Sequence, residues 1–326
     1  MTSTNVIDEQ QQLTWNISCV TSAVVDLVLF LSMLRIIVPV MSHQALRAKK
    51  EWVLLTGLCV ADGMVGLGSV QFYTGYYGHQ VSHNATMFNI SKWDCVLYPH
   101  NLLWNVGTAP RGLLMALISI DRFVLVRWPT FYLSKVTVNM YRTIVGIVFG
   151  HTLLLTIESY VAVYRDRSIT TNINLCNQMA SVRDGFFVFS MLIFYAGALL
   201  SVIAQILTVV ALKLRDRKVQ SKSGENHISA AQREYTRRVN KSALMTFLFV
   251  ILPCILGVLE RNTQSDGIDM LREAVNAVLF MAPSINSILN AVIFIRSNDV
   301  LRCAWQATLK CKKLPANVDL WKNLPQ

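Results

Sequence analysis

The stretch Gly185–Leu212, GFFVFSMLIFYAGALLSVIAQILTVVAL, contains no Asp, Glu, Lys or Arg. A helix of about 20 apolar residues is long enough to cross the hydrocarbon core of a bilayer, which is about 30 Å thick. Two further stretches, Ser242–Leu259 and Ala274–Ile295, also lack charged residues. Over all 326 residues, 53% are hydrophobic and 15% are charged, and the mean hydropathy is +0.42. This composition excludes a soluble protein and indicates a chain that lies in a lipid bilayer.

Seven stretches are long enough to span a bilayer: Val20–Met41, Trp52–Tyr76, Tyr98–Val126, Arg142–Tyr164, Gly185–Lys213, Lys241–Glu260 and Leu271–Ile295. We expect helices in all seven, because a span in lipid must satisfy its backbone internally and the alternation of a barrel is absent. After them, Ser297-Asn298 provides a helix cap, and one face of the following segment carries Val300, Leu301, Ala304, Trp305 and Thr308. The predicted fold is an all-α membrane protein: a seven-transmembrane helix bundle (20–295) with a short amphipathic eighth helix on the inner leaflet.

The distribution of Lys and Arg predicts the orientation of these spans. With the N-terminus outside, 22 of the 30 Lys and Arg residues lie on the cytoplasmic side and 6 lie on the outer side. We therefore expect an extracellular segment 1–19, a cytoplasmic segment 296–326 and a multi-pass protein of the plasma membrane. The net charge of +11 then belongs to the inner loops, so no nucleic-acid partner is expected.

Modification and metal signals are few. The sequons at Asn84 and Asn89 lie in a predicted outer loop and are expected to be glycosylated. Cys303 and Cys311 are either palmitoylation sites or free cytosolic thiols. The chain has no CxxC or HxxxH spacing, so neither a metal nor a cofactor is expected.

The inner end of the third span carries the most specific motif, Asp121–Tyr132, DRFVLVRWPTFY. This run resembles the DRYxxVxxPLxY motif of rhodopsin-like (class A) G-protein-coupled receptors. The matching positions are Asp121, Arg122, Val126, Pro129 and Tyr132, while Phe123 and Thr130 differ. An arginine at the membrane boundary can be held by a neighbouring carboxylate in one state and released to a partner in another. The resemblance implies a heterotrimeric G protein as the partner of Arg122, with Glu234 as a second restraining carboxylate.

Two other spans carry weaker motifs of the same family. Asn286–Phe294, NSILNAVIF, is similar to NSxxNPxxY, with Ala291 for Pro and Phe294 for Tyr. The polar residues of this motif should face the bundle interior, as switch residues or as polar contacts between helices: Asn286, Ser287 and Asn290. In the sixth span, Phe247 and Pro253 fit FxxCWxP, whereas its Cys and Trp are replaced.

The resemblance also implies a disulfide between Cys95 and Cys176, which both lie on the predicted outer side. Cys95 precedes Arg122 by 27 residues, two more than is usual in the family. The third helix is therefore expected to begin with an irregular turn.

Two intramembrane charges give the inference most specific to this chain. Asp62, in LCVADG, matches the family's LAxAD, whose Asp binds sodium. Arg111 lies eleven residues, or three helical turns, before Arg122, where the family has a Ser of the sodium site. We expect Arg111 to replace the sodium ion as a fixed cation beside Asp62; alternatively, Pro110 rotates Arg111 toward another group.

The expected ligand pocket is aromatic, with neutral amides and hydroxyls, and is lined by Asn101, Trp104, Asn105, Thr108, Cys254, Val258, Asn276, Phe280 and Ser284. The seventh span has no Schiff-base lysine, and neither Leu102 nor Trp104 supplies the acid of an aminergic receptor. A neutral or weakly polar small molecule is the expected ligand.

These patterns predict a receptor that is not an enzyme and that signals from an extracellular ligand to a G protein. The altered motifs resemble divergent invertebrate, nematode-type chemosensory receptors, so a chemosensory small molecule is expected and a neuropeptide is the alternative. A secondary transporter or channel is the rival class, but no internal repeat is visible and the Asp121–Tyr132 run has no role in one. His151 and Glu158, on one polar face of the fourth span, are too isolated for a hydrolase.

Overall fold

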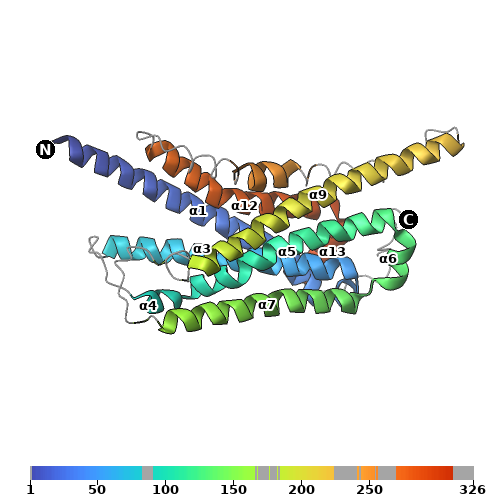
Figure 1. The fold of residues 1–326 in the computed structure, drawn as a ribbon, viewed down its shortest axis with the longest axis horizontal. Coiled ribbons are helices and arrows are strands. Elements are labelled where there is room, and N and C mark those ends of the chain that lie inside the picture. The colour runs from blue at the N-terminus through green and yellow to red at the C-terminus, as the bar shows by residue number, and fades with distance from the viewer. Residues whose placement is uncertain are drawn as a thin grey trace.

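The computed structural model describes residues 2–82, 91–165, 167, 176, 182, 184–223, 241, 244–253, 255 and 269–310. In the part of the chain that the structure describes, six long helices form an elongated bundle (Figure 1): α1 (Thr2–Ser42), α3 (Lys50–Ser82), α5 (Pro99–Arg127), α7 (Val138–Arg165), α9 (Asp184–Ser223) and α12 (Asp269–Ser297). Shorter elements lie between or after them: α2 (Gln44–Arg47), α4 (Lys92–Val96), α6 (Pro129–Lys135), the π-helical turn η1 (Phe247–Ile251) and α13 (Asp299–Leu309).

Four segments of the described helices are long and apolar enough to cross a membrane: Ile17–Ser42, Lys50–Gly75, Val138–Arg165 and Gly185–Leu214. Helix α12 adds a shorter apolar segment, Met281–Arg296. Helix α5 is more polar because it lies inside the bundle, where it packs most extensively against α9 and α3. Protein rather than lipid therefore surrounds its buried polar side chains, which include Asn101, Asn105 and Arg111.

The helices differ from the predicted spans mainly at their ends. Helix α1 begins at Thr2 rather than Val20, since no Gly or Pro interrupts the chain before Pro39. Helix α3 continues beyond Tyr76 to Ser82. The sequence did not predict the loop helices α2 and α6; α6 begins with Pro129, whose fixed φ suits the first helical position. Most of the predicted sixth span lies outside the described residues.

The irregular start of the third helix is confirmed. Cys95 lies in the separate helix α4. The helical conformation is interrupted at Leu97 and Tyr98, and α5 then begins with Pro99 in its first turn. The two extra residues are absorbed in this break. Helix α5 then runs unbroken through Pro110 to Arg127, so positions counted back from Arg122 are the valid ones.

Helices α5 and α9 meet at two glycines. A Cβ atom on Gly112 would lie 2.5 Å from the Cα of Phe194, and a Cβ on Gly197 would collide with the backbone of Gly112. Only a residue without a side chain fits either position, and the two backbones consequently approach closely.

The predicted eighth helix is present as α13. The Asn298 side chain accepts a hydrogen bond from the Leu301 amide at 3.2 Å, as a helix cap does. The buried face of α13 includes Leu301 and Ala304. His43 Nε2 lies 3.2 Å from the Ala304 carbonyl oxygen. Cys303 is exposed on this helix, and Cys311 lies outside the described residues.

Candidate functional site

An ion pair lies at the centre of the bundle. Arg111 Nε is 2.5 Å from Asp62 Oδ1, and both side chains are about 95% buried, with 5% and 4% of their surface exposed. Arg111 Nη2 also donates to the Pro283 carbonyl at 2.6 Å and to Ser287 Oγ at 2.9 Å. The guanidinium carbon lies 5.5 Å from the centre of the Phe194 ring. This one arginine of α5 therefore contacts α3, α9 and α12, and it occupies the position beside Asp62 that the helical count from Arg122 indicated.

The density of contacts around Arg111 has a physical cause. Removing an arginine and a carboxylate from water costs several kcal/mol per ion, and a close pair with further hydrogen bonds is needed to offset it. Here the carboxylate supplies the counter-charge beside Nε, while Pro283 and Ser287 accept hydrogen bonds from Nη2 of the guanidinium.

A second buried acid, Asp26 of α1, was missed at the sequence level. It is 7% exposed, it faces the hydroxyl groups of Ser69 and Ser284, and it lies within electrostatic reach of Arg111. One of its oxygens, Oδ1, is buried without a hydrogen-bond partner among the described residues. A signal was available, because an acid inside the predicted span Val20–Met41 already requires a place in the bundle interior.

The polar motif of α12 faces this interior. Asn286 and Ser287 are buried, and Asn290 Nδ2 donates to Asn286 Oδ1 at 3.2 Å. Phe294, one turn further on, packs edge-on against Trp52 with ring centres 5.5 Å apart. The motif thus divides into a polar part beside Arg111 and an aromatic end that packs against α3.

At the predicted cytoplasmic end, two tyrosines hold Asp121. The Tyr132 hydroxyl donates to Asp121 Oδ2 at 3.3 Å, and the Tyr141 hydroxyl donates to Asp121 Oδ1. Burial raises the pKa of the Tyr132 phenol well above its ordinary value, so the group stays a neutral donor. Lys50 Nζ lies 3.5 Å over the Tyr132 ring and donates to the Tyr132 carbonyl at 3.1 Å.

Arg122 lies next to this cluster but does not join it. Its side chain is half-buried, and it makes no ion pair with Asp121 in the described part of the chain. The sequence suggests that Asp121 can hold Arg122; in the structure the carboxylate accepts its hydrogen bonds from the two tyrosines, and Arg122 acts on it only as a nearby charge. Phe123 packs edge-on against Trp128, with ring centres 5.9 Å apart. Glu234 lies outside the described residues.

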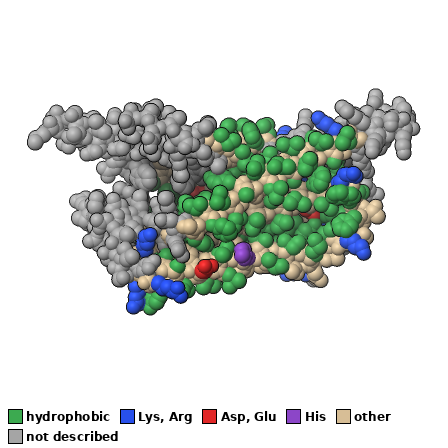
Figure 2. Space-filling view, in the orientation of Figure 1, with side chains coloured by type: hydrophobic (Ala, Val, Ile, Leu, Met, Phe, Trp, Pro, Cys, Tyr) green, Lys and Arg blue, Asp and Glu red, His purple; other side chains and the backbone are tan. Residues whose placement is uncertain are grey.

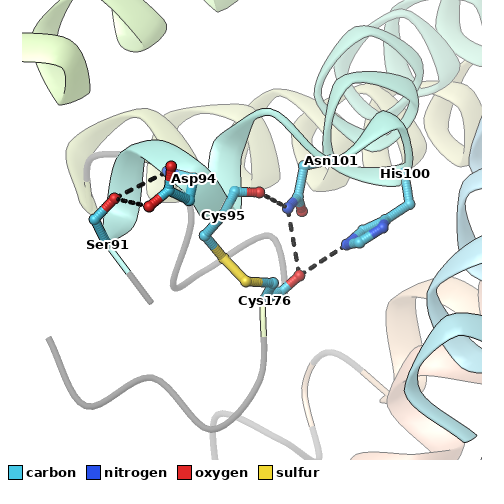
Figure 3. Close-up of a disulfide and its surroundings, with 6 residues drawn as sticks. All are labelled: Ser91, Asp94, Cys95, His100, Asn101 and Cys176. Carbon is cyan, nitrogen blue, oxygen red and sulfur yellow. Dashed lines mark hydrogen bonds between the residues drawn. A yellow bond between two sulfur atoms is a disulfide. The ribbon is translucent and has the colours of Figure 1, made fainter. Parts of the chain in front are cut away.

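The disulfide between Cys95 and Cys176 is confirmed, with Cα atoms 5.2 Å apart (Figure 3). Asn101 Nδ2 donates to the Cys95 carbonyl at 2.8 Å and to the Cys176 carbonyl at 3.3 Å. His100 Nε2 lies 2.8 Å from the same Cys176 carbonyl. Side chains at the start of α5 therefore contact the backbone carbonyls of both cysteines of the disulfide.

Replacing either bridge cysteine with serine should destabilise the fold by about 2 to 4 kcal/mol, because the bridge closes a long loop with a sequence separation of 81. Surface expression should fall for Cys95→Ser and Cys176→Ser, and the double variant should be no worse than either. Cys303→Ser, which removes an exposed free thiol, is the matched control and should express normally. Additive losses in the double variant would contradict the pairing.

The predicted pocket residues fall into different environments. Asn101 serves the disulfide rather than an open pocket, whereas Trp104 is half-buried and donates from Nε1 to Ser69 Oγ at 3.0 Å. The Trp104 ring packs against Phe72 and His100, with centres 5.1 and 5.5 Å away. Asn105 and Thr108 are buried, and the Thr108 hydroxyl donates to the Trp104 carbonyl.

The other pocket and glycosylation residues are only partly visible. Ser284 is buried beside Asp26. The side chains of Asn276 and Phe280, and all of Cys254, Val258, Asn84 and Asn89, lie outside the described residues. Among the residues that the structure describes, no group of three or more His, Cys, Asp or Glu side chains could hold a metal ion.

The model of the family described as 7 transmembrane receptor (rhodopsin family) matches residues 33–294. That range contains the buried ion pair, the Asp121–Tyr132 run and both cysteines of the disulfide. A search of the curated proteins gives no match.

Proposed function

Because the chain belongs to the rhodopsin family of seven-transmembrane receptors, we propose that it transmits the binding of an extracellular small molecule to a heterotrimeric G protein. Membership of this family supports a receptor over a transporter or an enzyme. The orientation, the ligand class and the G-protein contact are our inferences, and each has its own support.

The proposed orientation places the N-terminus and the disulfide outside the cell. The excess of Lys and Arg at the opposite end supports this orientation, with 22 residues against 6. The disulfide agrees with it, because such bonds persist in oxidising surroundings.

The observation that carries the signalling proposal is that Arg122 makes no ion pair with any residue that the structure describes, although Asp121 and Glu51 lie within electrostatic reach of it. Its expected partner, Asp121, already accepts hydrogen bonds from Tyr132 and Tyr141. A half-buried guanidinium at the membrane boundary is thereby left available for acceptor groups of a partner protein. We infer that the G protein supplies those acceptors and that the two tyrosines keep Asp121 from competing for Arg122.

The test is the Arg122→Ala variant, with Arg127→Ala as its control on the same helix. Losing hydrogen bonds from a charged group should reduce nucleotide exchange roughly 10- to 100-fold, with surface expression unchanged. Arg127 is exposed and lies over Trp128, so its removal should have little effect. Full exchange by Arg122→Ala would contradict the proposal. Raised basal exchange in Glu234→Gln would show that Glu234 restrains Arg122.

The ligand class is inferred from the surroundings of Trp104. The Trp104, Phe72 and His100 rings offer aromatic contacts, and Trp104 is linked through Ser69 to Asp26 near the Arg111 ion pair. A small, weakly polar molecule that moves Trp104 would therefore act on the charged centre of the bundle. A screen of odorants and neuropeptides on cells that express the chain with a promiscuous G protein would identify an agonist and distinguish the two ligand classes.

A further inference from the structure

The interior of the bundle holds one acid more than the central ion pair uses. Hydrophobic side chains cover most of the described middle of the face shown in Figure 2, and Lys and Arg lie mainly toward its ends. Inside the bundle, two carboxyl groups, Asp26 and Asp62, lie near one guanidinium, that of Arg111. Arg111 pairs with Asp62 and donates to Pro283 and Ser287. It therefore acts on Asp26 only as a nearby charge.

The neighbours of Asp26 leave one of its oxygens unmatched. The carboxyl group faces the neutral hydroxyls of Ser69 and Ser284. Trp104 Nε1 donates to Ser69 Oγ at 3.0 Å, so the Ser69 hydroxyl can turn its own hydrogen toward Asp26. Asp26 Oδ1 is buried and has no hydrogen-bond partner among the described residues, none of which forms an ion pair with Asp26. A buried acid in these surroundings requires a cation.

Asp26 lies on the outer side of the ion pair in the proposed orientation. Ser69 follows Asp62 by seven residues on α3, and Trp104 precedes Arg111 by seven residues on α5. Seven residues of helix correspond to about 10 Å along the axis. With the N-terminus outside, both steps lead away from the cytoplasm. A cation from outside the cell would therefore meet Asp26 before it met the ion pair.

The side chains further out than Asp26 are aromatic. The Phe72 ring lies 5.2 Å from that of Tyr73 and 5.1 Å from that of Trp104, and Tyr73 lies within electrostatic reach of Asp26. These three aromatic side chains are only half-buried. Aromatic faces attract organic cations, and their surface also suits an apolar ligand body. Among the described residues, no group of three or more acids, histidines or cysteines could hold a metal ion instead.

We propose that Asp26 binds the protonated amine of the ligand, and that the ligand is a small, otherwise apolar molecule with one amine group. Its single positive charge balances the one acid that Arg111 does not pair with, and the aromatic rings contact its apolar body. A neutral ligand, as the sequence led us to expect, would leave this charge unmatched. The expectation changes because the acid comes from α1 and not from the third span. The inference rests on the proposed function, since it names the ligand class of the proposed receptor.

Cysteine accessibility on intact cells tests the site without a known ligand. Ser284→Cys places a thiol beside Asp26, and methanethiosulfonate reagents with an aminoethyl or a hydroxyethyl group are added outside. The rate ratio of the charged to the neutral reagent should be roughly 10-fold higher with Asp26 than with Asp26→Asn in the same background, because the acid concentrates cations. The ratio cancels any effect of the acid on the thiol itself, and the unmutated chain gives the background of native cysteines. Equal ratios, or no reaction with either reagent, would overturn the proposal.

The thermal midpoint of purified receptor tests ligand binding directly. The probes are primary amines and the alcohols of the same carbon skeleton, such as 2-phenylethylamine and 2-phenylethanol. At least one amine should raise the midpoint while its alcohol does not, and Asp26→Asn should weaken the binding of that amine about 10- to 100-fold, as expected for a hydrogen bond to a charged group. Asp94→Asn, which neutralises an exposed acid of α4, is the matched control and should bind the amine normally.

Three results would contradict the amine site: alcohols that stabilise the unmutated receptor as much as amines do, a panel in which no amine stabilises it, or amine binding that survives in Asp26→Asn. The comparison of amine with alcohol uses the unmutated chain, so it decides the question even if Asp26→Asn folds poorly. Neither experiment involves a G protein. Failure of the amine site is therefore distinguishable from failure of the proposed function, which the Arg122→Ala variant tests.

Discussion

Replacing Arg111 with serine should destabilise the receptor by about 3 to 5 kcal/mol, because a buried carboxylate loses its counter-charge. The loss should exceed that of Asp62→Asn. Without Arg111, both Asp62 and Asp26 are left in the interior, whereas without the Asp62 charge Arg111 keeps Asp26 within electrostatic reach. In Asp62→Asn, Arg111 also keeps its hydrogen bonds to the Pro283 carbonyl and to Ser287. The measurement is the thermal midpoint of purified receptor, together with its yield.

The double variant and a sodium series provide the controls. Asp62→Asn combined with Arg111→Ser should recover stability relative to Arg111→Ser, since directly coupled residues are not additive. The unmutated receptor should have the same thermal midpoint in sodium and choline chloride, because a fixed cation already occupies the space beside Asp62. Arg111→Ser should be partly rescued by sodium. Strictly additive losses, or a sodium-dependent midpoint of the unmutated protein, would contradict the assigned role of the pair.

Local patterns in the sequence were sufficient for much of the fold. Long charge-free stretches predicted helices such as α9, and a capping Asn with a one-sided apolar pattern predicted α13. The helix ends were less predictable. Helix α1 continues far beyond its apolar part because the polar residues before Val20 are compatible with a helix, and hydropathy carries no signal for that extension.

The site was predictable where counting along one helix was enough. Arg111 lies beside Asp62 because α5 is continuous from Pro110 to Arg122, so three helical turns could be counted. The span of Asp26 signals that this acid faces the interior, but its neighbours there, and the pairing of Asp121 with Tyr141, depend on how separate helices face each other, which no single segment encodes. The role of Asn101 depends in the same way on the position of Cys176, which is distant in the sequence but lies beside the start of α5.

Gly197→Ala and Gly112→Ala should each destabilise the bundle by at least about 3 kcal/mol, at the upper end of overpacking effects. The added Cβ at Gly197 meets the Gly112 backbone, and the one at Gly112 meets the Phe194 backbone. Neither obstacle is a flexible side chain that could rotate away, so α5 and α9 must separate. Phe194 also lies against the Arg111 guanidinium, so separation of the helices would loosen the ion pair as well.

Gly146→Ala is the matched control for this prediction. Gly146 also lies inside a membrane-crossing helix, but a Cβ there would meet nothing within 4 Å. Because alanine favours a helix over glycine by up to about 1 kcal/mol, this variant should be at least as stable as the unmutated chain. The thermal midpoint should therefore fall for Gly112→Ala and Gly197→Ala and hold for Gly146→Ala. Equal midpoints for all three variants would mean that α5 and α9 do not meet at these glycines, and that the position of Phe194 beside Arg111 has another cause.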